Sequence, residues 1–246
     1  MLRKLLSFGR APVHRVPDGL TVYAVGDIHG RLDLLQQVHR RIADDPARGR
    51  KLVVYLGDYV DRGPQSREVV ELLLGPPQGD WEAVFLRGNH EQAMLDYLEN
   101  WQVARDWLGF GGEATLRSYD LRVPFAMDKA TLVELQKEVA LGVPMSHWAF
   151  MRMCALSHAV GDYLFVHAGI RPGTRWDRQL PEDLMWIREA FLSSRADHGK
   201  MVVHGHTICD GVEFRPNRIG IDTGAFMTGV LTCLVLEGTE RRLIQT

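Results

Sequence analysis

Two segments decide the fold: residues 21–30, TVYAVGDIHG, and residues 52–63, LVVYLGDYVDRG. In each segment a short apolar run rich in β-branched residues stops abruptly at a turn that contains glycine and aspartate. Three further runs stop as abruptly at a polar turn that contains glycine, at residues 83–86 before RGNHE, 163–166 before HAG and 201–203 before HGHT. Continuous apolar runs of this length are typical of strands that are buried on both faces.

Helical patterns separate the first three of these runs. Apolar residues recur with helical spacing over residues 32–42 and 66–74. Strand, helix and strand in succession predict right-handed crossovers and a parallel sheet core. Asp27 and Asp58 are 31 positions apart, as are Asp58 and Asn89, and one crossover unit takes roughly 30 residues. We therefore expect each unit to deliver a polar side chain to the same edge of the sheet.

The chain after residue 91 differs in character. Residues 92–107 and 130–141 read as helices, and the linker between them carries several glycines. We therefore expect residues 92–160 to form a helical cap that is inserted over the sheet edge. Three later runs are expected to be short strands of a meander: residues 218–223, 230–237 and 241–244.

Composition and charge narrow the class of protein. A chain of 246 residues with 46% hydrophobic and 24% charged residues can bury a full hydrophobic core, so its fold needs no disulfide or structural metal ion for stability. No linker is distinct enough to split the chain into independent domains, so we expect one domain over residues 1–246, with a basic tail at residues 1–17. The net charge of −2 gives no whole-molecule attraction for nucleic acid or acidic membranes, so neither is an expected partner.

Cysteine usage and hydropathy indicate the compartment. The cysteines, Cys154, Cys209 and Cys233, are scattered and include no CxxC pair, which favours a reducing environment. No apolar stretch approaches the roughly 20 residues of a spanning helix. We expect a cytoplasmic protein, with a transit peptide or a membrane-surface helix at the basic N-terminus as the open alternative.

The five predicted strand ends carry carboxylate, amide and imidazole side chains and no thiolate. Taken singly, such residues are more often helix caps, turn residues or structural histidines. Together they suit Mn²⁺, Fe or Zn²⁺, and they exceed what one ion needs. Two ions about 3.5–4 Å apart, with one carboxylate between them, would use all of these donors. The donors are Asp27, His29, Asp58, Asn89, His167 and His206.

The blocks GDIHGR, GDYVDRG, RGNHE, FVHAG and VHGHT resemble the signature blocks of the metallophosphoesterase superfamily. They are most similar to those of the phosphoprotein phosphatase (PPP) family, in its compact bacterial and phage serine/threonine phosphatase branch. WLGFGG and IDTGA are similar to further features of that branch. The resemblance implies an α/β fold, an α/β/β/α sandwich with two mixed sheets and a helical cap insertion.

The resemblance also implies an activity. It indicates a metal-dependent phosphoric monoester hydrolase in which a metal-bridging hydroxide attacks the phosphate directly. The implied substrate is phosphoserine or phosphothreonine on proteins, or a small phosphoester. The implied cofactor is a pair of divalent ions, with Mn²⁺ expected and Fe, Zn²⁺ or Co²⁺ as alternatives. The sequence leaves the physiological substrate, the targeting partners and the oligomeric state open.

Each block supplies metal ligands in the implied site. Asn89 is in addition implied to contact the substrate phosphate. Many phosphodiesterase and nuclease members read GHxH in the last block, where this chain has Ile208. We therefore expect the first ion to have fewer protein ligands. The implied ligands are Asp27 and His29 for the first ion, Asp58 between the ions, and Asn89, His167 and His206 for the second.

Five further residues are implied to handle the proton and the phosphate. His90 would be the general acid that protonates the leaving oxygen, and Asp61 would orient it. Arg62 and Arg188 would grip the phosphate oxygens, with Arg87 as a weaker candidate for the same task. A histidine titrates in the right range for this role, and arginine binds phosphate with two parallel hydrogen bonds.

Competing functions remain open at this point. Hydrolysis of dinucleoside tetraphosphates such as diadenosine tetraphosphate would use the same metal site. A non-catalytic scaffold on this fold is the other alternative, although its members usually lose ligands that are intact here. The sequence has no GxxxxGK[ST], which excludes a P-loop, and its blocks offer no covalent triad.

Residues outside the blocks are expected to be structural. His204 lies two positions before His206, and we favour packing or a backbone hydrogen bond over contact with the site. Trp101, Trp107, Trp148 and Phe150 are more typical of cap packing than of a substrate groove.

Overall fold

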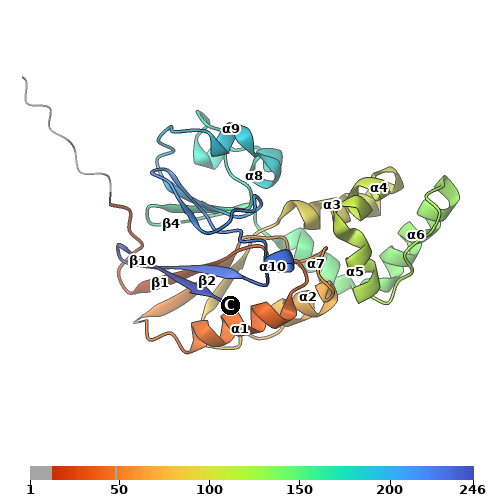
Figure 1. The fold of residues 1–246 in the computed structure, drawn as a ribbon, viewed down its shortest axis with the longest axis horizontal. Helices are drawn as coiled ribbons and strands as arrows, with labels where there is room; N and C mark the ends of the chain where they lie inside the picture. The colour runs from red at the N-terminus through yellow and green to blue at the C-terminus, as the bar shows by residue number, and fades with distance from the viewer. Residues whose placement is uncertain (1–12, 48) are drawn as a thin grey trace, which may run out of the picture.

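The computed structural model describes residues 13–47 and 49–246, and it consists of two stacked sheets with a group of helices to one side (Figure 1). The first sheet pairs its strands in the order β10-β9-β1-β2-β3, and the second in the order β4-β5-β6-β8-β7. Strands of the first sheet are β1 (Leu20–Val25), β2 (Arg50–Tyr55), β3 (Glu82–Phe85), β9 (Thr232–Glu237) and β10 (Glu240–Gln245). Strands of the second sheet are β4 (Ser157–Val160), β5 (Tyr163–Val166), β6 (Met201–His204), β7 (Glu213–Phe214) and β8 (Arg218–Gly220).

Both sheets mix parallel and antiparallel pairs. β1, β2 and β3 are parallel to one another, and the β9–β10 hairpin adds antiparallel to β1. In the second sheet β5, β6 and β8 are parallel, while β4 and β7 pair antiparallel at the edges. The expected crossover helices are present as α1 (Leu32–Ala43) and α2 (Ser66–Leu74).

Side chains along β1 show how the layers form. Tyr23 and Val25 belong to the cluster that packs against α1 and α2, whereas Val22 and Ala24 belong to the cluster between the sheets. A third cluster covers the outer face of the second sheet with α8 (Pro181–Trp186) and α9 (Glu189–Leu192). Figure 1 shows the resulting layers, with α1 on one side and α8 and α9 on the other. The predicted α/β/β/α sandwich is confirmed, and the apolar runs of β1, β2, β5 and β6 are buried as predicted. The run in β3 is exposed or half-buried instead, because β3 is an edge strand of the first sheet.

The helical segment is less regular than its sequence predicts. The helix expected over residues 92–107 is broken, because Asn100 is extended with φ −140° and ψ 104°. A 3₁₀ turn, η1 (Trp101–Val103), and a wide turn, η2 (Leu108–Gly112), flank the short α4. We call residues 101–153 the helical arm. The arm follows α3 (Asn89–Glu99). Its helices are α4 (Ala104–Trp107), α5 (Glu113–Ser118), α6 (Lys129–Gly142) and α7 (Met145–Met153).

Two strand expectations need correction. The segment 92–160 is not helical to its end, because Ser157–Val160 forms β4, the edge strand beside β5. The three C-terminal strands do not form one meander. β8 pairs with β6 in the second sheet, and only β9 and β10 form a hairpin in the first. The apolar pattern of a short run identifies a strand but does not record which neighbour it pairs with.

Most of the expected basic tail, residues 1–17, lies outside the described residues. Its last part is anchored, since the Arg15 N–H donates to Asp162 at 2.9 Å and Val16 is fully buried. In the described part of the chain, no helix has both the length and the apolar character needed to cross a membrane.

The remaining short helices are η3 (Trp176–Arg178) and α10 (Ala225–Thr228).

Candidate metal centre and active site

The turns that follow β1, β2, β3, β5 and β6, which we call the strand-end turns, bring their polar side chains to one place. Two groups of three residues have candidate ligand atoms within 4.8 Å of one another. Asp58 belongs to both groups, so its carboxylate lies at the centre of the cluster. The groups are His29, Asp58 and His90, and Asp58, His167 and His206.

The other two expected ligands join the same cluster. The His206 N–H donates to Asp27 Oδ2 at 3.0 Å. Asn89 Oδ1 lies 2.9 Å from His167 Nε2. The structure therefore brings together all six residues that were expected to hold metal, from segments that lie far apart in the sequence.

The backbone of these turns is strained. His29, Asp58 and His206 have φ values of 45°, 51° and 63°. Positive φ costs a non-glycine residue about 1–2 kcal/mol, and such conformations concentrate at functional sites. Gly63 permits the close approach of two turns, since a Cβ there would lie 2.0 Å from the carbonyl oxygen of His29. The backbone of the turns is therefore strained at the place where their side chains converge.

Two buried atoms of the cluster lack a hydrogen-bond partner. Among the residues that the structure describes, nothing pairs with Asp27 Oδ1 or His206 Nε2. An unpaired buried polar atom costs about 1–3 kcal/mol, so native proteins rarely keep one without a ligand. Oxygen and imidazole donors around a shared carboxylate suit a pair of divalent cations. The residues present therefore fit the expected metal pair.

The protonation states of three of the six residues also suit metal binding. Burial lowers the pKa of His29 to about 3 and that of His206 to about 2, so both imidazoles stay neutral. Burial raises the pKa of Asp58, but the surrounding histidines outweigh burial and hold that pKa below its usual range. Metal ligands must be deprotonated, and these three groups already are.

A second feature of the cluster is a buried histidine–carboxylate pair. His90 Nδ1 lies 2.8 Å from Asp61 Oδ2, and His90 Nε2 faces Asp58 Oδ2 at 3.8 Å. Burial alone would lower the pKa of His90, but Asp58 and Asp61 outweigh burial and raise it. Asp61 is held in turn by the Thr115 hydroxyl at 2.7 Å and by the Trp107 indole N–H at 3.3 Å. Asp61 therefore holds the His90 ring through Nδ1, and the ring presents Nε2 to the cluster.

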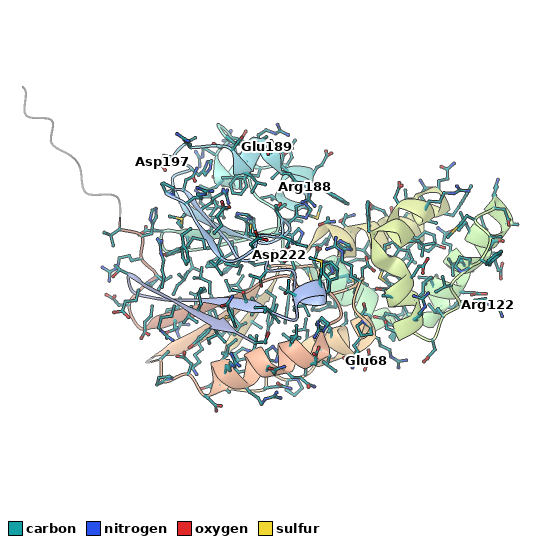
Figure 2. The ribbon with its side chains drawn as sticks, viewed as in Figure 1. Glu68, Arg122, Arg188, Glu189, Asp197 and Asp222 are labelled. Atoms are coloured by element: carbon teal, nitrogen blue, oxygen red, sulfur yellow. The ribbon has the colours of Figure 1, made fainter. Side chains whose placement is uncertain are left out.

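Two arginines border the cluster. Arg62 Nη1 lies 3.1 Å from His29 Nε2, and its guanidinium stands 4.8 Å over the ring of Phe226. Arg188 Nη1 donates to Thr207 at 3.3 Å, and its side chain is otherwise exposed. Figure 2 places Arg188 beside α8, on the side of the second sheet that faces the helical arm. Both guanidinium groups keep free donors for an anion.

A family model described as calcineurin-like phosphoesterase matches residues 20–220. The chain belongs to this family. It is accordingly a hydrolase that acts on phosphoesters, and its family implies a dinuclear divalent metal site for which the cluster supplies candidate ligands.

Curated relatives of this phosphoesterase include two bacterial enzymes that align over most of their length. Serine/threonine-protein phosphatase 1 of Salmonella typhimurium is 31% identical over 218 residues, which cover 86% of this chain and 89% of the relative. Serine/threonine-protein phosphatase 2 of Escherichia coli is 26% identical over 220 residues, which cover 86% and 90%. The symmetrical bis(5'-nucleosyl)-tetraphosphatase of Dechloromonas aromatica is 32% identical over 155 residues, which cover 62% of this chain and 45% of that enzyme.

Solved structures share the fold at low sequence identity. A cold-active protein tyrosine phosphatase superposes with a TM-score of 0.61 at 16% identity, covering 98% of this chain and 87% of the other. A metallophosphoesterase from Sphaerobacter thermophilus superposes with a TM-score of 0.51 at 14% identity, covering 93% and 89%. At these identities the likeness shows the fold alone.

One expected phosphate ligand of the phosphoesterase does not join the cluster. The Arg87 guanidinium donates to the carbonyls of Met151 and Arg152 and to the Gln92 side chain. These contacts tie the end of β3 to α7 and engage all three nitrogens of the guanidinium group. The expectation that Arg87 grips the phosphate is therefore not supported.

Glu91 was not among the expected site residues, although RGNHE ends on it. Its buried carboxylate accepts four backbone N–H groups at 2.7–3.2 Å. Burial and the neighbouring Asp58 raise the pKa of Glu91 to about 7. The four hydrogen bonds to this carboxylate fix the turn that carries Asp58. The donors belong to Asp58, Tyr59, Val60 and Gly88.

Asp222 is a second residue that sequence reasoning missed. It follows β8, which runs parallel to β6, so it reaches the same edge of the second sheet. Its Oδ1 accepts the Gly224 N–H at 2.9 Å, and burial raises its pKa to about 6. After burial itself, Asp222 is the largest cause of the raised pKa of Asp27. Figure 2 shows Asp222 near the centre of the molecule, between the two sheets. The signal was an apolar run that stops at aspartate in IDTGA.

The residues expected to be structural do pack. His204 Nδ1 lies 3.1 Å from the Gly205 carbonyl, and its Nε2 lies 3.3 Å from Arg218. Trp107 and Trp148 are buried in the main core. Trp107 also reaches Asp61, so its packing role and its contact with the site coincide.

Proposed function

We propose that this phosphoesterase removes phosphate from phosphoserine and phosphothreonine side chains, with His90 as the general acid. The observation that carries the proposal is the buried His90–Asp61 pair, which aims Nε2 at the six-residue ligand cluster. The two serine/threonine phosphatases that align over about nine-tenths of their length support this choice of substrate.

The six clustered side chains would hold two divalent ions, of which Mn²⁺ is the one we expect. When bound, the ions supply an activated water molecule and neutralise the charge of the phosphate. Asp58 belongs to both ligand groups, so its carboxylate would serve both ions. The ligands would be Asp27, His29, Asp58, Asn89, His167 and His206.

Residues of the chain perform the remaining tasks. Arg62 and Arg188 bind the phosphate oxygens from the two sides of the cluster, since guanidinium groups match phosphate geometry. Asn89 lies beside His167 and would contact the phosphate as well. His90 donates its Nε2 proton to the leaving oxygen, because Asp61 occupies Nδ1. Asp61 also stabilises the charged imidazole before the transfer.

Hydrolysis of dinucleoside tetraphosphates is the second candidate. The Dechloromonas aromatica enzyme supports it at 32% identity, but the aligned part is under half of that enzyme. A side-by-side assay with a phosphoserine peptide and diadenosine tetraphosphate separates the two. A kcat/KM that is higher for the tetraphosphate would replace the main proposal.

Substitution of the acid tests the mechanism. His90→Asn is expected to lower kcat on a phosphoserine peptide by about a hundredfold or more, because general acid catalysis is lost. His158→Asn on β4 is the matched control, since His158 lies outside the cluster, and it should keep wild-type kcat. Full kcat in His90→Asn, or activity that survives exhaustive chelation, would contradict the proposal.

A further inference from the structure

A second group of basic side chains surrounds a cavity that the proposed reaction does not use. The cavity has a volume of about 590 Å³, which is in the range of small-molecule sites. Its wall comes from the loop after α9 and from the turn between β7 and β8. Guanidinium groups match the geometry of phosphate and carboxylate groups, so this wall indicates a site for an anion. We call it the arginine cavity, after Arg195, Arg215 and Arg218 in its wall.

The arginine cavity and the metal cluster lie at different ends of β8. Arg218 is the first residue of this strand, whereas Asp222 follows its last residue and influences Asp27 in the cluster. An extended chain advances about 3.3 Å per residue, so Arg218 and Asp222 are about 13 Å apart along the chain. In Figure 2, Asp197, which belongs to the same loop as Arg195, lies at the end of the second sheet that is away from the helical arm. A small ligand in the cavity therefore leaves the metal cluster free.

Arg218 is a buried side chain with one unpaired donor. The residue is 3% exposed, its Nη1 donates to Glu213 at 2.5 Å, and its Nη2 donates to the Leu192 carbonyl at 3.1 Å. Within the described part of the chain, nothing accepts a hydrogen bond from its Nε. An unpaired buried polar group costs about 1–3 kcal/mol, and more when it is charged, so native proteins rarely keep one without a ligand or a water molecule. The unpaired donor thus favours an acceptor in the cavity that Arg218 lines.

The positive charge around the cavity exceeds the negative charge that pairs with it. The carboxylate of Glu213 accepts hydrogen bonds from both Arg215 and Arg218. Asp197 accepts a backbone N–H of its own loop at 2.8 Å and is not part of the wall. Three guanidinium groups against the Glu213 carboxylate leave an excess of two positive charges. A phosphate monoester carries a charge of about −1.5 to −2 at neutral pH, which matches this excess better than a single carboxylate does.

The two segments of the wall are tied to each other. The buried Asn217 side chain donates to the carbonyls of Ser194 and Ala196, at 3.0 and 2.9 Å. The Arg215 N–H donates to the Arg218 carbonyl at 2.8 Å and closes the turn between β7 and β8. These hydrogen bonds hold the loop after α9 against the turn, so the shape of the cavity is built into the fold.

We propose that the arginine cavity binds the phosphate group of a small phosphorylated molecule, at a site separate from the metal centre. Arg195 and Arg215 bind the phosphate oxygens, and Arg218 supplies its unpaired donor. Leu192 and Pro216 also line the cavity and offer apolar surface to the carbon part of the ligand. The inference does not depend on the proposed function, because none of these residues takes part in the proposed reaction.

Isothermal titration calorimetry on the Mn²⁺-loaded protein tests the site. The probes are butylphosphonate, whose phosphorus–carbon bond a phosphoesterase does not hydrolyse, and inorganic phosphate. Wild type should bind butylphosphonate in the cavity in addition to any binding at the metal centre. Arg195→Gln should weaken the cavity binding by about tenfold, because a charge-assisted hydrogen bond is lost, and should keep the wild-type kcat on a phosphoserine peptide. The control is Arg122→Gln, an exposed arginine that Figure 2 places on the helical arm, and it should change neither.

The remaining outcomes each decide the question. Arg215→Gln, in the exposed turn, should weaken binding as Arg195→Gln does, so the result does not depend on the folding of one loop. Unchanged binding in both variants overturns the inference, as does equal weakening by the control, which would be a general effect of charge. Loss of peptide hydrolysis together with binding in Arg195→Gln also overturns it, because the phosphonate would then bind at the metal centre. Tighter binding of inorganic phosphate than of butylphosphonate in the cavity would overturn the assignment to a phosphorylated molecule and make free phosphate the ligand.

Discussion

In the strand-end turns, side chains are positioned by backbone conformations that few non-glycine residues adopt, whereas in the helical arm they are positioned by short helices and the η2 turn. His29, Asp58, Asp61, Arg62 and His206 all have positive φ. In the arm, as far as the structure describes it, Asp120 is the non-glycine residue with positive φ, and it is exposed. The turns thus carry strain where side chains converge, whereas the arm uses a glycine, Gly111 with φ 112°, where it contacts Arg62.

The arm acts on the site through contacts with the turns. Thr115 and Trp107 bond to Asp61, and the Gly111 carbonyl bonds to the backbone of Arg62. Phe110 is the arm residue whose ring stands directly beside His90. The turns thus contain the groups that we propose to react, while the arm holds Asp61 and Arg62 in place.

The largest effect is expected in the turns. Asp58→Asn removes the carboxylate shared by both ligand groups, so the protein should lose at least one ion and roughly a hundredfold or more in kcat/KM. Elemental analysis of the purified protein and an assay on a phosphoserine peptide check both. Asp33→Asn on α1 is exposed and should change neither. Wild-type metal content and activity in Asp58→Asn would place the reaction elsewhere.

A smaller effect is expected at Glu91 in α3, whose carboxylate accepts backbone N–H groups of the turn that carries Asp58. Glu91→Gln replaces one acceptor oxygen by an amide that faces backbone N–H groups, so the free energy of unfolding should fall by about 2 kcal/mol. Urea denaturation measures this change. Glu99→Gln, at the exposed end of the same helix, should stay within about 0.5 kcal/mol of wild type. An unchanged midpoint for Glu91→Gln would show that the turn does not need the carboxylate.

The smallest effect tests the arm. Thr115→Val removes a hydroxyl that bonds to Asp61 and should lower kcat by about tenfold with little change in KM, because the His90–Asp61 pair loses its support. Thr115→Ser should restore the activity, and the exposed Thr239→Val should not alter it. If the serine variant fails to restore kcat, the effect is one of packing and the arm does not act through Asp61.

Strand–helix alternation predicted the parallel core, because each apolar run and each helical period is a local signal. The sequence did not predict the pairing of β8 with β6 or the edge strand β4. Both pairings depend on strands that are far away along the chain, and a short apolar run does not indicate which strand it pairs with. The break at Asn100 was also not predicted, because the apolar spacing of residues 92–107 continues across it.

The candidate ligands could be found from the sequence because each follows a strand, and parallel strands end at a common edge. Glu91 and Asp222 gave the same kind of signal, at the end of RGNHE and in IDTGA, but neither was expected to touch the site. The contacts of Arg87 with α7 were not predicted, because its position in a block does not tell which way its side chain turns. The arginine cavity was not predicted, since its residues come from two segments with no common pattern.

The most direct test of the central claim is a crystal structure of the protein grown with Mn²⁺, with anomalous scattering recorded at the manganese edge. We expect two anomalous peaks on opposite sides of the Asp58 carboxylate, one near Asp27 and His29 and the other near His167 and His206. A single peak, or peaks away from Asp58, would contradict it.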